Sequence, residues 1–129
     1  MNGFLGTYNI NLDEKGRINV PAKFKTILDR SYDSNLVVCV MDNFLIAFPQ
    51  KEWLLNEEKL NDLSGLNRED RDKMREFYAR ASECEIKSGK ILISQNQREI
   101  AGLQKEVVLV GMSKTFEIWA ADRWNQQSL

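Results

Sequence analysis

The residue types best suited to chemistry lie in one short segment, DEKGRINVP at residues 13–21. Gly16 tolerates the positive φ that a tight turn requires, and the Asp13 carboxylate can accept main-chain N–H bonds across that turn. Lys15 and Arg17 would then stand at the tip as free donors. Because arginine offers a planar fork and lysine a mobile charge, such a tip suits contact with phosphate. A capped turn with solvated charges is the alternative interpretation.

A second basic turn lies further along the chain, in the segment KSGK at residues 87–90. Its Gly89 and Lys90 follow Gly16 and Arg17 at a constant spacing of 73 residues. One chain would therefore present two basic turns related by pseudo-symmetry, which weakens the interpretation as a capped turn with solvated charges.

The other side chains that could do chemistry argue against an enzyme. The chain has no histidine, so neither a histidine-based catalytic triad nor a histidine-rich metal site can form. Cys39 and Cys84 lie in apolar segments and form no CxxC pair, which indicates packing rather than a disulfide or zinc site. The paired carboxylates near Glu57, Glu69 and Asp72 lie on expected polar helix faces. The sequence shows no set of metal ligands and no nucleotide-binding loop.

Composition and charge define the broader class. The 129 residues are 43% hydrophobic and 29% charged, which is typical of a soluble globular protein. The longest apolar stretch, Leu36 to Met41, is far shorter than the roughly 20 residues of a membrane span, and the N-terminal segment does not resemble an export signal. We therefore expect a cytoplasmic protein. The net charge is −1, but residues 1–30 carry five basic and three acidic side chains.

The elements that must position the first basic turn are two strands and a helix. Residues 4–12 alternate apolar and polar side chains, and we expect them to form a hairpin with a return strand over residues 17–20. Pro21 suits the first turn of a helix that runs to about Arg30. The basic turn would therefore be the tip of a hairpin that leads into a helix.

The same order of elements occurs three more times. Residues 36–48 predict a hairpin around Asp42-Asn43, and Pro49 then opens a helix. The later elements are a strand–turn–strand segment over 82–93, a helix from Ser94 to about Gly102, a hairpin over 106–119 and a last helix with Trp124. Equivalent pairs at a spacing of 71 are Met41 and Met112, Phe48 and Trp119, and Trp53 and Trp124. The chain is therefore interpreted as an internal duplication, with its tryptophans as core anchors.

A charged segment separates the two copies. Asn67 can cap a helix with Asp70 at its third position, and apolar residues from Met74 to Ala81 recur at helical spacing. This helix would cover one edge of the core, or would contact another subunit. The expected organisation is a first repeat over residues 1–53, a linker helix region over 54–81 and a second repeat over 82–129.

Five segments carry a resemblance to a known family. In order they are FLGTYNINLDEKGRINVPAKFK, ASECEI, GKILIS, AGLQKEVVLVG and FEIW. Together they resemble the MraZ family, bacterial proteins built from two AbrB-type swapped-hairpin units, and the resemblance covers essentially the whole chain. It implies an α+β fold in which two pseudo-symmetric AbrB/SpoVT-like β-hairpin units with helices form one compact domain, a double-split, swapped-hairpin barrel.

The resemblance also implies a function. Such a protein would be a sequence-specific transcriptional regulator, expected to repress the division and cell-wall gene cluster by binding direct repeats upstream of its own operon. Its partners would be double-stranded DNA and further copies of itself in an octameric or dodecameric ring, in the cytoplasm and associated with the nucleoid. No cofactor, metal, membrane or small-molecule substrate is expected. A ring-forming scaffold without specific DNA binding is the alternative.

Site residues follow from the family motif Asp-x-x-Gly-Arg. The implied DNA contacts are Lys15, Arg17, Lys87 and Lys90, and the residues that shape the turns are Asp13, Gly16 and Gly89. The second copy departs from the motif, because Lys90 replaces arginine and an ungapped comparison places Ile86 at the aspartate position in a segment one residue short. Since lysine cannot reproduce the bidentate contact of arginine to guanine or phosphate, we expect Arg17 to be the base reader, and Lys87 and Lys90 to contact phosphates.

Overall fold

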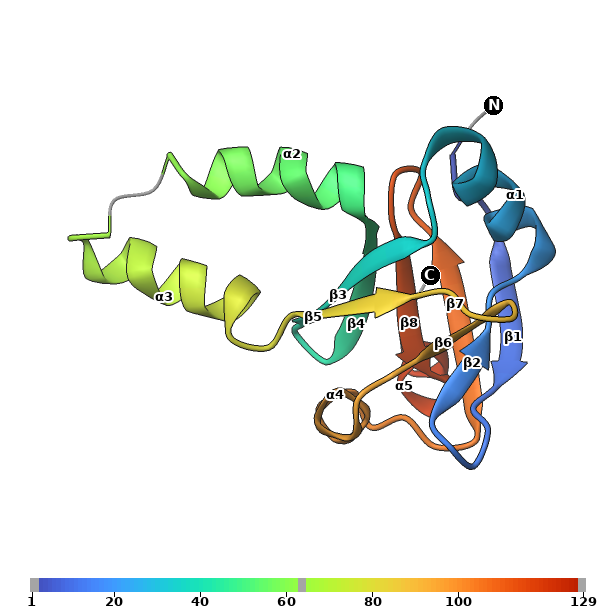
Figure 1. Cartoon of the computed structure of the whole chain (residues 1–129). Coiled ribbons are helices and arrows are strands. Elements are labelled where there is room, and N and C mark those ends of the chain that lie inside the picture. The colour runs from blue at the N-terminus through green and yellow to red at the C-terminus, as the bar shows by residue number, and fades with distance from the viewer. Residues whose placement is uncertain (1–2, 63–64, 128–129) are drawn as a thin grey trace.

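The structure, a computed structural model, describes residues 3–62 and 65–127. In chain order the elements are β1 (Thr7–Asn11), β2 (Arg17–Asn19), α1 (Ala22–Ser31), β3 (Asn35–Met41), β4 (Phe44–Pro49), α2 (Gln50–Leu60), α3 (Arg68–Tyr78), β5 (Ser82–Glu85), β6 (Lys90–Leu92), α4 (Gln95–Ala101), β7 (Glu106–Gly111), β8 (Phe116–Ala120) and α5 (Ala121–Asn125) (Figure 1). The expected α+β class is confirmed. None of the helices within the described ranges is long and apolar enough to cross a bilayer.

Two hairpins form the centre of a six-stranded antiparallel sheet with the order β1-β7-β8-β4-β3-β5. The predicted β3–β4 and β7–β8 hairpins are both present, and β4 pairs with β8 to join them. Asp42 occupies the first turn with a φ of 49°, a conformation that aspartate and asparagine tolerate better than most residues. The two central hairpins therefore connect the repeats through the middle of the sheet.

The two outer hairpins predicted from the sequence are wrong. Strand β1 pairs with β7, β5 pairs with β3, and β2 pairs with β6 in a separate two-stranded ribbon. In the ribbon Ile18 lies opposite Ile91, and both side chains are almost fully buried in the main core. An alternating pattern specifies which face a strand buries but not which strand it pairs with. Each repeat thus supplies one strand of the ribbon, as the expected swapped arrangement requires.

Local signals at the helix ends are confirmed by the caps. The Asn67 side chain accepts hydrogen bonds from two main-chain N–H groups at the start of α3, and Ser94 Oγ accepts one from Gln97 N at the start of α4. Pro21 and Pro49 immediately precede α1 and α2. Helix α4 ends at Gly102, which has a left-handed φ of 65°. These caps fix where each helix leaves the sheet.

Two apolar clusters lie on opposite faces of the sheet. The larger one contains the rings of Phe4, Phe24 and Phe116, which contact one another with centroids 5.1 to 5.4 Å apart. On the other face Trp53 of α2 packs against Phe48 and other residues of a smaller cluster. Strand β3 contributes side chains to both clusters, one on each face of the sheet, which explains why its sequence is apolar at successive positions.

Helices α2 and α3 lie side by side and extend away from the sheet (Figure 1). The Tyr78 hydroxyl donates to Glu57 Oε2 at 3.3 Å, and the Tyr78 ring contacts Trp53 edge to face. None of the α3 residues is fully buried, and Phe77 is the residue that packs against the smaller cluster. The predicted amphipathic helix is present, and it contacts the sheet near its C-terminal end through Phe77.

A buried glutamine joins the two repeats at the base of α4. Gln97 is 2% exposed, and its Nε2 donates to the carbonyl oxygens of Val38 and Arg80, each at 2.9 Å. The Ser82 hydroxyl lies 3.2 Å from Gln97 Oε1. Gln97 therefore holds α4, β3 and the start of β5 together through hydrogen bonds shielded from water.

Replacing this glutamine is expected to destabilise the fold. The Gln97→Met substitution keeps a long side chain but leaves both carbonyl partners without their donor, which costs about 2 kcal/mol of unfolding free energy. Urea denaturation followed by circular dichroism measures this loss. The control is Asn96→Met at an exposed position of the same helix, where a change of at most about 0.5 kcal/mol is expected. Equal unfolding free energies for the two variants would contradict the role of Gln97.

Candidate nucleic-acid interface

The first basic turn is organised by the Asp13 side chain. Asp13 Oδ1 accepts hydrogen bonds from Lys15 N at 2.9 Å and Arg17 N at 2.8 Å. The main chain closes the turn, because Asp13 N donates to the Arg17 carbonyl at 2.9 Å and Gly16 N donates to the Asp13 carbonyl at 3.0 Å. Gly16 has a φ of 85°, which only glycine adopts without strain. The main chain therefore forms a tight turn here, closed by its own hydrogen bonds and by the Asp13 carboxylate.

The same carboxylate contacts two cations. Asp13 Oδ2 lies 2.9 Å from Arg17 Nε and 3.8 Å from Lys90 Nζ. The main-chain N–H of Arg17 is the largest influence that lowers the pKa of Asp13, and the Arg17 guanidinium lowers it further. Asp13 therefore stays ionised. It links the first turn to β6 of the second repeat.

The second turn is shorter and has no carboxylate. Lys87 N donates to the Lys90 carbonyl at 2.9 Å, and Lys90 N donates back to the Lys87 carbonyl at 3.0 Å. The two residues between them, Ser88 and Gly89, have φ values of 52° and 74°, as a two-residue hairpin turn requires. The shortened segment is thus confirmed.

The hydrogen bonds show that the expected equivalence between Ile86 and the motif aspartate is wrong. The bond from Lys87 N to the Lys90 carbonyl corresponds to the bond from Asp13 N to the Arg17 carbonyl. Lys87, not Ile86, therefore stands at the aspartate position, because the deleted residue lies inside the turn. The second repeat replaces the organising negative charge with a positive one.

The ribbon of β2 and β6 presents a basic outer face. Because Ile18 and Ile91 point into the core, Arg17 and Lys90 on either side of them point outward. Their side chains are 40% and 35% exposed. Asn19 and Leu92 complete this outer face and are exposed.

The two turns lie at opposite ends of this ribbon, since the strands that follow them run antiparallel (Figure 1). Lys15 and Lys87 are exposed in the two turns. The structure brings Arg17 and Lys90 together around Asp13, whereas the turns that hold Lys15 and Lys87 are separated by the length of the ribbon. Basic groups therefore occur along the whole outer face rather than at one tip.

Sequence reasoning missed one cation beside the first turn. Arg98 on α4 is half-buried, and its Nε donates to the Ile93 carbonyl at 3.1 Å. A Cβ atom added to Gly16 would lie 2.7 Å from Arg98 Cζ, so the guanidinium packs directly against this glycine. No motif signals this contact. The nearest local signal is that Arg98 lies in the last turn of a short helix that Ser94 caps.

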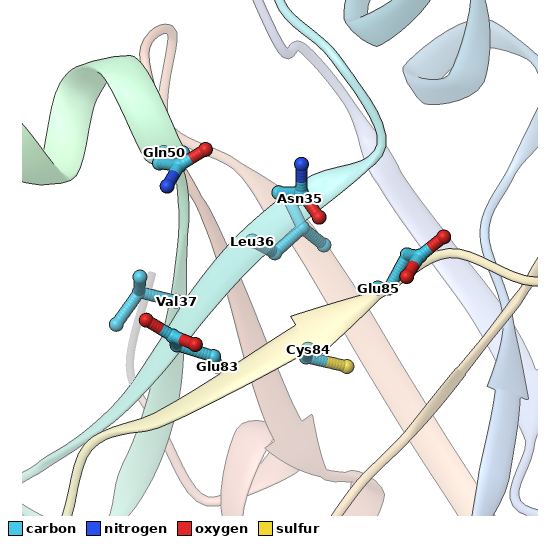
Figure 2. A pocket seen from close by; sticks show the side chains of 7 residues that line it. All are labelled: Asn35, Leu36, Val37, Gln50, Glu83, Cys84 and Glu85. Atoms are coloured by element: carbon cyan, nitrogen blue, oxygen red, sulfur yellow. The ribbon is translucent and has the colours of Figure 1, made fainter.

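A hollow elsewhere on the described part of the chain is acidic and differs from this basic face. A hollow of about 250 Å³ beside β5 is lined by Glu83, Glu85, Asn35 and Gln50 among others, and its carboxylates disfavour nucleic acid (Figure 2). Cys84 also lines it, and burial raises the pKa of its thiol, which keeps the sulfur protonated. Over residues 3–62 and 65–127, no three histidine, cysteine, aspartate or glutamate side chains are grouped to hold a metal.

Comparison with known proteins agrees with this architecture. The family model described as "MraZ protein, putative antitoxin-like" matches the chain twice, over residues 4–76 and 77–128. The two matches confirm the internal duplication predicted from the repeated order of elements.

Several curated relatives are named "Transcriptional regulator MraZ". The relative from Ligilactobacillus salivarius is 45% identical over 122 residues, which cover 94% of this chain and 83% of the relative. The relative from Carboxydothermus hydrogenoformans is 42% identical, with 95% and 84% covered. The relative from Lachnoclostridium phytofermentans is 42% identical, with 97% and 86% covered. Because the similarity spans both repeats and nearly the whole length, the chain belongs to the MraZ family.

Proposed function

We propose that the chain is a sequence-specific DNA-binding transcriptional regulator that represses the division and cell-wall gene cluster. The observation that carries the proposal is the Asp13-organised turn, which carries Lys15 and places Arg17 and Lys90 around one carboxylate on the outer face of a two-stranded ribbon. The names of the relatives support a role in transcription. The proposed site is direct repeats upstream of the chain's own operon.

Arg17 would read bases, and the lysines would hold the DNA backbone. Asp13 engages Arg17 Nε, while no hydrogen bond joins either Arg17 Nη atom to the part of the protein that the structure describes. Those Nη atoms are the groups that bind guanine or phosphate in a planar, two-point contact. The major groove admits a two-stranded β-ribbon, so the outer face of β2 and β6 fits that groove. Lys15, Lys87 and Lys90 would then contact phosphates.

Pre-organisation by Asp13 supports affinity. An arginine held by a carboxylate and a closed turn loses less conformational freedom on binding than a free arginine does. Asp13 is thereby a positioning group although its own charge repels phosphate. Arg17 and Lys90 pair with this carboxylate. Together with Lys15 in the same turn, these three cations outnumber the carboxylates of Asp13 and Glu14, so the balance favours DNA.

A ring of copies would compensate for the low net charge of −1. An octamer or dodecamer would place equivalent ribbons side by side, and linked sites raise the overall affinity without new contacts. Cyclic neighbours would meet successive repeats in the same orientation, which suits direct repeats rather than a palindrome. The proposed partners are therefore double-stranded DNA and further copies of this chain, at the nucleoid in the cytoplasm.

Removing the Arg17 guanidinium is expected to abolish sequence discrimination. In fluorescence anisotropy with the upstream duplex and a scrambled duplex, Arg17→Ala should weaken binding to the upstream duplex by at least about tenfold and leave the scrambled duplex little changed. The control is Arg75→Ala, which removes an exposed arginine that also pairs with an aspartate, on α3 away from the ribbon. Weak, equal binding of the unmodified protein to both duplexes, unchanged by Arg17→Ala, would favour the scaffold alternative.

Binding is expected to depend on the number of repeats and on salt. An upstream duplex with two repeats should bind much more tightly than one with a single repeat, because neighbouring copies engage together. An assembly that neutralises about six phosphates should lose roughly a thousandfold in affinity between about 50 and 200 mM salt. Anisotropy titrations, together with light scattering to measure the mass of the assembly, check both expectations. A monomer with the same affinity for both duplexes would contradict the ring.

The Asp13 network predicts a defined loss of stability in acid. The pKa of Asp13 in the folded protein lies below its usual 3.8. The stabilisation of the fold by ionised Asp13 is therefore complete above about pH 4, and it is lost as pH falls through the lower pKa of the folded protein. Asp13→Asn should therefore show a smaller fall in Tm between about pH 5 and pH 3 than the unmodified protein does. The control is Asp33→Asn, since Asp33 also accepts a main-chain N–H, from Asn35. An unchanged acid slope for Asp13→Asn would refute the ionic link.

A further inference from the structure

The two basic turns differ in what lies beneath them. The Arg98 guanidinium packs against Gly16 in the first turn, whereas a Cβ added to Gly89 in the second turn would meet nothing within 4 Å. At the spacing of 73 that relates the turns, the equivalent of Arg98 is Lys25 on α1, which is exposed. Only the first of the two turns therefore has an arginine from the other repeat beneath it.

Hydrogen bonds connect Arg98 to the first turn in two steps. Ile93 N donates to the Gly16 carbonyl at 2.9 Å, and the carbonyl of the same Ile93 accepts from Arg98 Nε at 3.1 Å. Arg98 N also donates to the Ser94 carbonyl in the first turn of α4. The backbone of Arg98 is thus fixed by a capped helix, and its side chain reaches back across Ile93 to Gly16.

We propose that Arg98 is a positioning residue for Lys15 and Arg17, an inference that rests on the proposed DNA-binding function. Glycine at position 16 permits the positive φ of the turn but does not favour it over other conformations. The guanidinium packed on Gly16, together with the bonds through Ile93, restricts the turn to the conformation that aims both cations outward. Arg98 acts through the turn and does not itself contact DNA.

The inference assigns different tasks to the two repeats. In the first turn the Asp13 carboxylate binds Arg17, and the Arg98 guanidinium packs against the adjacent Gly16. The second turn lacks both supports, which suits point-charge contacts by Lys87 and Lys90 with phosphates but not base reading. The first repeat would then read the bases through Arg17. The second repeat would support that turn through Arg98 and would contact the DNA backbone through Lys87 and Lys90.

A first experiment tests the support without DNA. Amide hydrogen exchange, read by NMR at Gly16, Arg17 and Ile93, should speed up at least about tenfold in Arg98→Ala, because the turn opens more often. Lys25→Ala is the matched control and should leave these three amides unchanged. Thermal unfolding of both variants shows whether the protein stays folded, and Arg98→Lys provides a milder variant that keeps the charge. Unchanged exchange at all three amides in Arg98→Ala would overturn the proposal.

A second experiment tests whether the effect on DNA passes through the turn. With the upstream duplex, Arg98→Ala should lower affinity about tenfold, yet it should add no more than about twofold when combined with Arg17→Ala. A direct phosphate contact by Arg98 would instead give additive losses and reduce the salt slope by about 0.9. Additive losses of that kind would overturn a positioning role.

The two proposals fail in distinguishable ways. If Arg17→Ala weakens binding to the upstream duplex and Arg98→Ala does not, the positioning inference alone is wrong. If Arg17→Ala has no effect on binding, the proposed function is wrong and the inference falls with it. Lys25→Ala should bind the upstream duplex as the unmodified protein does, and an equal loss in Lys25→Ala and Arg98→Ala would also overturn the special role of Arg98.

Discussion

The pairing of β2 with β6 is the constraint on which the rest of the structure depends. Ile18 and Ile91 meet at the centre of this ribbon and seal one side of the main core. Beyond the three paired positions, Val20 N donates to the Gly89 carbonyl and Ile93 N donates to the Gly16 carbonyl, so each basic turn is bonded to the opposite repeat. The buried pair supplies the hydrophobic stabilisation, while the flanking bonds hold the turns at the surface.

Small differences between the repeats have made two similar turns unequal. Loss of one residue shortens the second turn, and Lys87 stands where the first repeat has Asp13. The first turn gains an internal acceptor and an arginine beneath it, whereas the second has only its main-chain bonds. Pseudo-symmetry therefore fixes where the turns lie, and a few side chains determine how firmly each is held.

Features that depend on residues close together in the sequence could be predicted here. Features that depend on residues far apart in the sequence could not. Ser94 and Asn67 cap their helices as expected, and the turn around Asp13 forms because its hydrogen bonds lie within five residues. The partners of β1 and β2 are unpredictable from alternation, which defines a buried face only. Contacts of Gln97 and Arg98 depend on the assembled repeats, so no pattern indicates them. That the basic groups contact DNA stays a prediction.

The long separation between paired strands also has a consequence for the order of folding. Tyr8 in β1 pairs with Leu109 in β7, and Ile18 pairs with Ile91, so these contacts close very long loops. During synthesis the chain emerges from its N-terminus, and β2 has no partner until β6 has left the ribosome. The central β3–β4 hairpin, whose strands are adjacent, can form much earlier. The ribbon of β2 and β6 is therefore completed late in folding, only after β6 (Lys90–Leu92) has emerged.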